Sequence, residues 1–214
     1  MKGSGNITPL FVYGFAFSSQ IWQSQIEELS NNFQVLAVGL RGHSKSGKPD
    51  SNYTYSEFAD DLEYVLESNG VMEAINVGWS MGSFVARKFL EIYPKRVRAL
   101  VLVGARVNSG LDLAKISEEV RRLGYFGQLR ESTRKRLTAD ADEQMVERLF
   151  QIRLSTPKIA NKIRESLSNY KDIEEPQKIG IPVLIINGRE DQSIKPEQGE
   201  LLHKEIHGSR LEIL

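Results

Sequence analysis

Short apolar runs alternate along this chain with segments in which apolar residues recur at helical spacing. The runs are continuous and rich in Val, Ile and Leu, as is typical of strands buried on both faces of a parallel sheet. Because helical segments separate the runs, the pattern predicts an α/β fold in which a mostly parallel sheet carries helices on both faces. The predicted strands are residues 10–13, 33–38, 74–77, 99–103, 182–186 and 211–214.

The helices expected between these strands carry their own start and stop signals. Thr54 and Glu57 have capping-box spacing at the start of one helix, and Gly70 follows its expected end. The next helix is predicted over residues 81–93, where Pro94 stops it. In sheets of this kind ligands bind beyond the carboxyl ends of the strands, so functional residues are expected there.

Residues 108–178 interrupt the alternation, because no convincing strand-like run occurs among them. Helical patterns do occur, for example at Ile159 and Ile163. We interpret this stretch as a helical cap inserted between two parts of the sheet domain, residues 1–107 and 179–214. An ordinary set of surface helices is the alternative, which periodicity alone does not separate from a cap.

Composition narrows the function classes. Lys plus Arg and Asp plus Glu both number 28, so the formal net charge is +0 and no overall field attracts nucleic acid or an anionic membrane. No apolar run approaches the roughly 20 residues that a membrane-spanning helix needs. The chain has no cysteine, which excludes disulfides and thiol catalysis and suits a reducing compartment. We therefore expect a cytoplasmic protein that binds neither nucleic acid nor membrane.

The segment Gly78-Trp79-Ser80-Met81-Gly82 matches the nucleophile-elbow pattern G-x-S-x-G. A predicted strand precedes it and a predicted helix follows, which is the context that the pattern requires. The glycines permit a sharp turn that exposes the Ser80 hydroxyl, and the Met81 N–H at the helix start faces the place where an oxyanion forms. We predict Ser80 as a catalytic nucleophile and Met81 as an oxyanion-hole donor. A serine that only caps a helix is the alternative.

Several segments, in order and over nearly the whole chain, resemble the α/β-hydrolase family. The segment LFVYGFAFSSQIW, residues 10–22, is similar to the third strand and oxyanion loop of that family. The resemblance implies that Phe15 supplies the second oxyanion-hole N–H, while Tyr13 stands where the family has His. The segment GLRGHS resembles the family's D-x-R-G-x-G loop, with Gly39 in place of Asp and Ser44 in place of Gly.

The same resemblance supplies a candidate for the acid of a catalytic triad. The segment Gly188-Arg189-Glu190-Asp191, followed by Pro196, is similar to the family's G-x-x-D-x-x-x-x-P. It implies that Asp191 holds the imidazole of the triad in the correct tautomer. Glu190 is expected to point the other way, and a capping role is the alternative for either residue.

The three histidines of the chain do not occupy the position expected for the base of the triad. The family's order is Ser, Asp, His, with the His after the last strand. His203 and His207 are expected at the opposite edge of the sheet from Ser80, because the helix that leads to them runs antiparallel to the strands. His43 is expected one strand away from the Ser80 strand. We therefore expect a chain truncated at both ends, without the family's opening strands and with a histidine within about ten residues after Leu214.

A serine nucleophile points to acyl transfer to water from an ester, thioester or lactone, with an ester as the broadest expectation. Residues 78–83 and 146–149 are similar to carboxylesterases that demethylate pimeloyl-acyl-carrier-protein esters. That resemblance implies a small-molecule or carrier-linked ester as substrate, with Leu149 and Arg153 as substrate-binding residues. Arg148 and Arg153 would meet an acidic carrier and its phosphate, with a solvated helix face as the alternative.

Two further classes of function stay open. An α/β-hydrolase-fold binding protein without turnover agrees with the missing base, whereas Ser80 and Asp191 favour catalysis. Perhydrolase or peptidase activity on the same triad is not discriminated from ester hydrolysis. No metal-ligand spacing, dinucleotide fingerprint or P-loop occurs, so we expect no metal and no cofactor.

Overall fold

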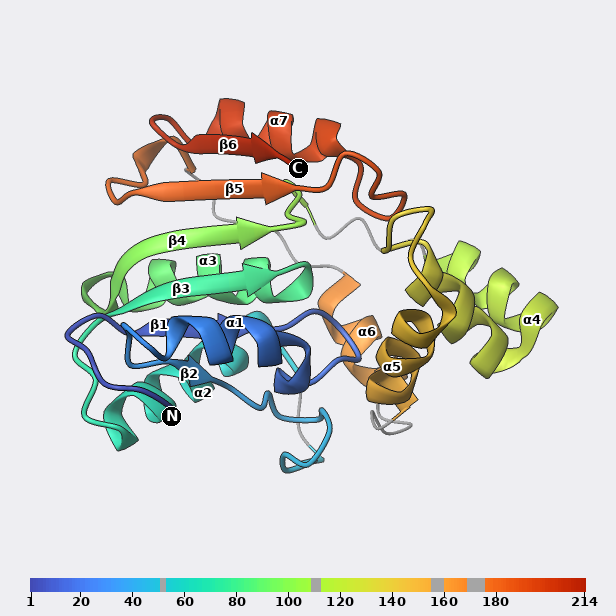
Figure 1. The fold of residues 1–214 in the computed structure, drawn as a ribbon, viewed down its shortest axis with the longest axis horizontal. Helices are drawn as coiled ribbons and strands as arrows, with labels where there is room; N and C mark the ends of the chain where they lie inside the picture. The colour runs from blue at the N-terminus through green and yellow to red at the C-terminus, as the bar shows by residue number, and fades with distance from the viewer. Residues whose placement is uncertain (51–52, 109–112, 155–159, 169–175) are drawn as a thin grey trace.

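One six-stranded sheet organises the part of the chain that the computed structural model describes, residues 1–50, 53–108, 113–154, 160–168 and 176–214 (Figure 1). Its strands are all parallel and lie in the order β2-β1-β3-β4-β5-β6. The predicted α/β fold is confirmed. The strands are Pro9–Val12 (β1), Leu36–Ala37 (β2), Ala74–Trp79 (β3), Val97–Val103 (β4), Val183–Asn187 (β5) and Arg210–Ile213 (β6).

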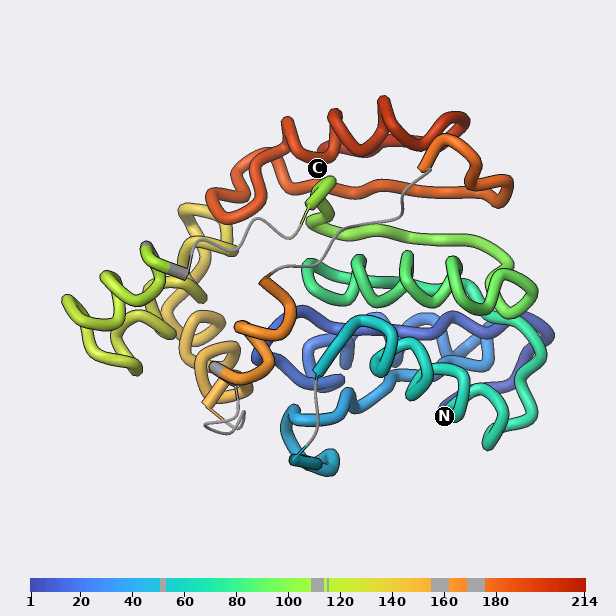
Figure 2. Tube along the Cα trace, turned by 180° about the vertical axis from the view of Figure 1, so that it is seen from behind, coloured from blue at the N-terminus to red at the C-terminus, as the bar shows by residue number. Residues whose placement is uncertain are grey.

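Helices cover both faces of this sheet. On one face lies α1 (Gln23–Leu29), and on the other lie α2 (Tyr55–Ser68) and α3 (Met81–Ile92), as Figures 1 and 2 show from opposite sides. Between β5 and β6 the chain forms α7 (Pro196–Glu205). Short 3-10 helices span Ser19–Trp22 (η1), Pro94–Arg96 (η2) and Pro176–Lys178 (η3).

The start and stop signals of α2 and α3 act as predicted. The Thr54 N–H donates to the Glu57 carboxylate at 2.8 Å, and the Glu57 N–H donates to Thr54 Oγ1 at 3.2 Å, which completes the capping box. Gly70, just after α2, adopts a φ of 66°, which favours glycine. The helix α3 ends at Ile92, two residues before Pro94. Local sequence therefore sets the limits of both helices.

The predicted strand at residues 33–38 is wrong in extent, because β2 is only two residues long. The start of the apolar run lies in the turn that follows α1, where the Phe33 N–H donates to the Leu29 carbonyl at 2.9 Å. Val35 pairs with Lys2: its N–H donates to the Lys2 carbonyl at 2.7 Å, and the Lys2 N–H donates back at 2.9 Å. Apolar composition alone does not distinguish a strand from a turn that follows a helix.

Between β4 and β5 the described residues form three long helices and no strand. They lie beyond the carboxyl ends of the strands, at the right of Figure 1. The first is interrupted at Gly124, which adopts a φ of 70°. Ile163 is fully buried, whereas Ile159 lies outside the described residues. The three helices, which we call the α4–α6 segment, are Leu113–Arg134 (α4), Glu143–Leu154 (α5) and Ala160–Ser168 (α6).

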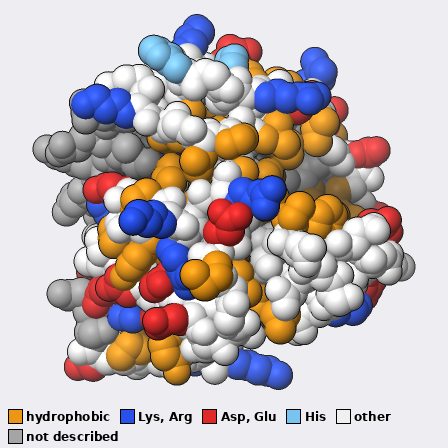
Figure 3. Space-filling view, turned by 90° about the vertical axis from the view of Figure 1, so that its left-hand side faces the viewer, with side chains coloured by type: hydrophobic (Ala, Val, Ile, Leu, Met, Phe, Trp, Pro, Cys, Tyr) orange, Lys and Arg blue, Asp and Glu red, His pale blue; other side chains and the backbone are white. Residues whose placement is uncertain are grey.

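The register of the sheet aligns the carboxyl ends of its central strands. Val12 of β1 pairs with Gly78 of β3, and Gly78 pairs with Leu102 of β4. Val103 of β4 pairs in turn with Ile186 of β5. The loops that follow these strands therefore leave the sheet at one edge, facing the α4–α6 segment. The opposite edge, where the strands begin, shows scattered charged and apolar side chains with histidines at the surface (Figure 3).

Candidate active site

Ser80 occupies a strained turn between β3 and α3. Its φ of 53° and ψ of −116° are rare for a residue with a side chain, and such a conformation costs about 1–3 kcal/mol. Neighbouring hydrogen bonds fix the turn: the Ser80 N–H donates to the Val103 carbonyl at 2.9 Å, and Ser83 Oγ donates to the Ser80 carbonyl at 2.6 Å. The turn has the geometry of a nucleophile elbow.

Close approach of backbone segments requires glycine on both sides of Ser80. A Cβ at Gly78 would overlap the Gly82 carbonyl oxygen, and a Cβ at Gly82 would overlap the Val12 carbonyl oxygen. Gly14, in the loop after β1, is also close, because a Cβ there would lie 3.1 Å from the Ser80 Cβ. Three elements, β3, α3 and the loop after β1, therefore converge on this serine.

The two predicted oxyanion-hole residues, Phe15 and Met81, line the same cavity as Ser80. Met81 is the first residue of α3, where backbone N–H groups lack partners within the helix and the helix dipole favours negative charge. Phe15 lies in a tight turn, in which the next residue, Ala16, adopts a φ of 63°. The structure thus brings both residues to the wall beside Ser80.

Asp191 follows β5 at the same edge of the sheet. Its Oδ1 accepts from the Ser193 N–H at 2.7 Å and from the Ile194 N–H at 2.9 Å. Its Oδ2 lies toward Gly104 at the end of β4, 3.8 Å from where a Cβ of that glycine would be. The Glu190 carboxylate is directed elsewhere and accepts from the Ala139 N–H at 3.3 Å. One oxygen of Asp191 is therefore anchored by the backbone, which fixes the orientation of the carboxylate.

His43 is fully buried in an aromatic cage. Its ring centre lies 5.6 Å from that of Tyr13, 6.0 Å from that of Phe15 and 6.3 Å from that of Phe58. Nδ1 is 3.0 Å from the Arg41 carbonyl, which can only accept, so Nδ1 carries the hydrogen. Burial lowers the pKa of His43 to about 4. This imidazole is neutral and does not line the cavity.

The other two histidines lie at the far end of α7. His203 is in the last turn of that helix, where its Nδ1 is 2.8 Å from Ser209 Oγ, and His207 follows the helix and is exposed. Leu214 lies at the other edge of the sheet, because its N–H donates to the Asn187 carbonyl at 3.0 Å and its carbonyl accepts from the Arg189 N–H at 2.7 Å. The end of β6 is thus held against the loop that leads to Asp191.

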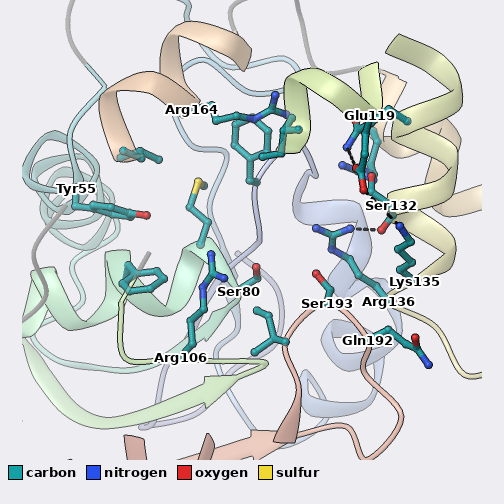
Figure 4. Close-up of a pocket in the computed structure, with 18 residues that line it drawn as sticks. Tyr55, Ser80, Arg106, Glu119, Ser132, Lys135, Arg136, Arg164, Gln192 and Ser193 are labelled. Carbon is teal, nitrogen blue, oxygen red and sulfur yellow. Dashed lines mark hydrogen bonds and ion pairs between the residues drawn. The ribbon is translucent and has the colours of Figure 1, made fainter. Parts of the chain in front are cut away.

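A cavity of about 490 Å³, within the usual size range of ligand sites, is bordered by Ser80 and by side chains of the α4–α6 segment (Figure 4). Its described lining is strongly basic. Four arginines approach it from different elements, and Lys135 joins them, whereas Glu119 is the acidic residue of that lining. We call the four arginines, Arg106, Arg136, Arg153 and Arg164, the arginine cluster.

Arg153 is the most enclosed member of the arginine cluster, with 3% of its surface exposed. One terminal nitrogen donates to the Leu129 carbonyl at 2.8 Å, to Ser132 Oγ at 2.8 Å and to Thr133 Oγ1 at 2.7 Å. Its Nε is buried without a hydrogen-bond partner among the described residues. Burial, followed by repulsion from Arg136, holds the pKa of Arg153 well below its usual range.

The other predicted substrate-binding residue does not line the cavity. Leu149 is partly buried and packs against the core, while Arg148, on the same helix, is exposed. Arg106, Arg136 and Arg164 were not predicted from the sequence. Arg106 could have been predicted, because it follows the carboxyl end of β4. Arg136 and Arg164 could not, because they lie in charged stretches of sequence that are typical of solvated surface.

No group of three or more His, Cys, Asp or Glu side chains is placed to hold a metal ion within the described ranges. In the same ranges no helix is long and apolar enough to cross a membrane. The expectations of a site without cofactor and of a cytoplasmic location stay predictions.

Two curated relatives match part of the chain. The 2-(acetamidomethylene)succinate hydrolase of Mesorhizobium japonicum is 32% identical in an alignment over 126 residues that covers 52% of this chain and 45% of that protein. The pimeloyl-[acyl-carrier protein] methyl ester esterase of Wigglesworthia glossinidia brevipalpis is 29% identical over 104 residues, 48% of this chain and 38% of that protein. The matched segments therefore span less than half the length of either relative.

A solved structure matches over the full chain. The thermophilic esterase of Thermogutta terrifontis, with malate bound, superimposes with a TM-score of 0.87 at 27% identity and covers 100% of this chain and 82% of that one. The profile of the alpha/beta hydrolase fold matches residues 10–214. The chain, with its elbow serine and parallel sheet, belongs to the α/β-hydrolase fold family.

Proposed function

We propose that this chain is the core of a serine esterase that cleaves a carboxylic ester through an acyl-enzyme on Ser80. The observation that carries the proposal is the strained Ser80 turn at the wall of a cavity that Phe15 and Met81 also line. Asp191, held by two backbone N–H groups, follows a strand two places along the sheet. Nucleophile, oxyanion donors and acid thus lie at one edge.

The α4–α6 segment acts in this proposal as a cap, inserted between residues 1–107 and 179–214. Its position beyond the carboxyl ends of the strands supports that role (Figure 1). It also supplies Arg153 and Arg164 to the lining of the cavity. A cap excludes water from the reacting atoms and selects the substrate.

In the proposed reaction the Ser80 hydroxyl oxygen attacks the carbonyl carbon of the ester while an imidazole accepts its proton. The N–H groups of Phe15 and Met81 stabilise the oxyanion, and one such donor is worth about 2.7–4 kcal/mol. The imidazolium returns the proton to the departing alcohol, which leaves the acyl group on Ser80. Water, activated by the same base, then releases the acid. Asp191 orients the imidazole throughout.

We propose that the base is a histidine held beside Asp191, near the end of β6. None of the chain's three histidines borders the described cavity lining. Leu214 is hydrogen-bonded to Asn187 and Arg189, so a residue soon after it would emerge beside the Asp191 loop. Without a base the Ser80 hydroxyl stays protonated and is a weak nucleophile. Oxyanion stabilisation alone would still exceed the reaction in water by roughly 10³–10⁴.

The substrate is proposed to be a small-molecule or carrier-linked ester. Similarity to a pimeloyl-[acyl-carrier protein] methyl ester esterase supports a carrier-linked methyl ester. The exposed Arg148 remains available for contact with an acidic carrier, whereas Arg153 is buried and acts inside the cavity. The proposal therefore keeps Arg153 as a substrate-binding residue and assigns contact with a carrier to Arg148.

A binding protein without turnover is the second candidate, and the absence of histidine from the described cavity lining favours it. The strained Ser80 turn favours catalysis, because a receptor gains nothing from a costly turn that exposes a serine. Perhydrolase and peptidase activities use the same parts, so rates with ester, peroxide and amide substrates are needed to rank them.

Hydrolysis of p-nitrophenyl acetate tests the proposal, with imidazole added to serve as base. Imidazole alone hydrolyses this ester, so the measured quantity is the release in excess of a protein-free control, and we expect that excess to be lost in Ser80→Ala. Ser193→Ala is the matched control, because that serine lines the same cavity and its backbone, not its side chain, binds Asp191. Equal rates in Ser80→Ala and Ser193→Ala would refute the proposed function.

A further inference from the structure

The members of the arginine cluster come together from separate parts of the chain. Arg106 lies in the loop after β4, Arg136 follows α4, Arg153 is in α5 and Arg164 is in α6. Figure 4 shows Arg106, Arg136 and Arg164 bordering the space around Ser80 from different sides. A solvated helix face does not produce such convergence, because it directs its charges outward.

The positive charges of this cluster repel one another. Burial is the main cause that lowers the pKa of Arg136; Asp191 opposes the effect, and repulsion from Arg106 and Arg164 adds to it. Burial likewise lowers the pKa of Arg164. Like charges in a partly desolvated site are costly unless a counter-charge is present.

Acidic groups of the described residues balance only part of this charge. Glu119 lies 3.5 Å from the Lys135 ammonium and pairs with that lysine. Asp191 attracts Arg136, but the proposed reaction uses this carboxylate to orient the base. The buried Nε of Arg153 has no hydrogen-bond partner among the described residues. Positively charged side chains therefore outnumber negatively charged ones in the described lining of the cavity.

We infer that the arginine cluster binds a second, anionic group of the substrate, a carboxylate or a phosphate, while the scissile ester lies against Ser80. This inference rests on the proposed function and names its substrate class: half-esters of dicarboxylic acids, or esters that carry a phosphate. The guanidinium fork matches both oxyanions in geometry. The bound anion offsets the repulsion within the cluster.

Three contacts hold members of the cluster in position. The Arg164 guanidinium carbon lies 5.0 Å from the centre of the Phe15 ring, and that of Arg153 lies 5.2 Å from the centre of the Phe17 ring. Arg136 is held by a hydrogen bond to the Ser132 carbonyl. Side chains fixed in this way lose little entropy when a ligand binds, which favours affinity.

Equilibrium binding to the 214-residue chain tests the inference, because it requires neither turnover nor a catalytic base. The probes are succinate, inorganic phosphate and uncharged succinamide, titrated calorimetrically. We expect succinate or phosphate to bind and succinamide to bind at least tenfold more weakly, since a hydrogen bond to a charged group contributes substantially. Tighter succinate binding identifies a carboxylate ligand, and tighter phosphate binding identifies a phosphorylated one.

Matched variants localise the site. Arg136→Gln and Arg164→Gln should weaken anion binding by about tenfold to a hundredfold. Arg148→Gln removes an exposed arginine that does not line the cavity and should leave it unchanged. Should a variant fail to fold, the salt dependence of anion binding to the unaltered chain gives a second readout, since binding to arginines weakens as salt rises.

Three results would overturn the inference: no anion binding, equal binding of succinamide, or unchanged affinity in both Arg136→Gln and Arg164→Gln. The proposed function is tested separately: it is refuted if Ser80→Ala and Ser193→Ala hydrolyse p-nitrophenyl acetate at equal rates. If anions bind but ester hydrolysis does not depend on Ser80, only the proposed esterase function is refuted. If ester hydrolysis depends on Ser80 but no anion binds, only the proposed substrate class is refuted.

Discussion

The Arg164 guanidinium carbon lies 5.0 Å from the centre of the Phe15 ring. This contact joins α6 to the loop after β1, which carries the proposed oxyanion donor. A parallel contact joins Arg153 of α5 to Phe17 of the same loop at 5.2 Å. Two contacts thereby tie the α4–α6 segment to the loop that carries Phe15 and Phe17.

A double-mutant cycle of Phe15→Leu and Arg164→Met measures the first of these contacts. Leu removes the aromatic ring of Phe15, Met removes the charge of Arg164 while keeping a side chain of similar length, and Phe15→Leu preserves the backbone N–H. We expect a coupling free energy of about 0.5–2 kcal/mol in urea unfolding, as for other partly desolvated cation–π pairs. Additive effects of the two substitutions would show that the contact contributes nothing.

Gly82→Ala should destabilise the fold by about 1–3 kcal/mol, because the new Cβ would overlap the Val12 carbonyl oxygen and force β1 and α3 apart. Gly47→Ala is the control, since a Cβ there meets no atom within 4 Å. Urea unfolding measures both. Equal stability of the two variants would contradict the close approach around the elbow.

The features that sequence analysis predicted correctly depend on short segments. Thr54 with Glu57 specifies a capping box wherever it starts a helix, and G-x-S-x-G between a strand and a helix predicts the turn around Ser80. The extent of β2 was not predictable in this way, because it depends on the hydrogen bonds that Val35 makes with the distant Lys2.

The arginine cluster was missed for a related physical reason. Arg136 follows α4 and Arg164 lies in α6, both in charged stretches of the sequence, where exposure is the usual expectation for arginine. Only the folding of the α4–α6 segment over the sheet directs them to the cavity. A charge pattern within one helix says nothing about which side that helix turns toward the core.

Asp191→Asn should slow ester hydrolysis by about 10⁴ with little change in stability, because an amide favours the wrong tautomer of the imidazole. The measurement requires a version of the protein that extends past Leu214 to include the proposed histidine. Glu190→Gln serves as the control, since the Glu190 carboxylate faces the Ala139 N–H. A rate for Asp191→Asn close to that of Glu190→Gln would place the acid elsewhere.

Acid should destabilise the fold partly through His43, whose pKa is about 4 in the native state against an ordinary value of 6.5. Between these values the unfolded chain binds the proton and the native protein does not, so stability falls as the pH falls. The loss approaches about 3 kcal/mol once the pH is below both values.

Urea unfolding at pH 7 and pH 5 measures the part of this loss that arises between those two pH values. The decrease should be smaller in His43→Gln than in the unaltered chain, and His207→Gln, which removes an exposed histidine, should keep the full decrease. An unchanged pH dependence in His43→Gln would assign the acid sensitivity to other groups.

Covalent labelling by a fluorophosphonate, mapped by peptide mass spectrometry, tests the central claim most directly. Ser132 and Ser193 line the same cavity as Ser80, so the position of the label distinguishes the elbow from its neighbours. We predict that imidazole accelerates labelling, that the label lies on Ser80, and that it is lost in Ser80→Ala but kept in Ser132→Ala and Ser193→Ala. A label on either neighbouring serine, or one that persists in Ser80→Ala, would contradict the account.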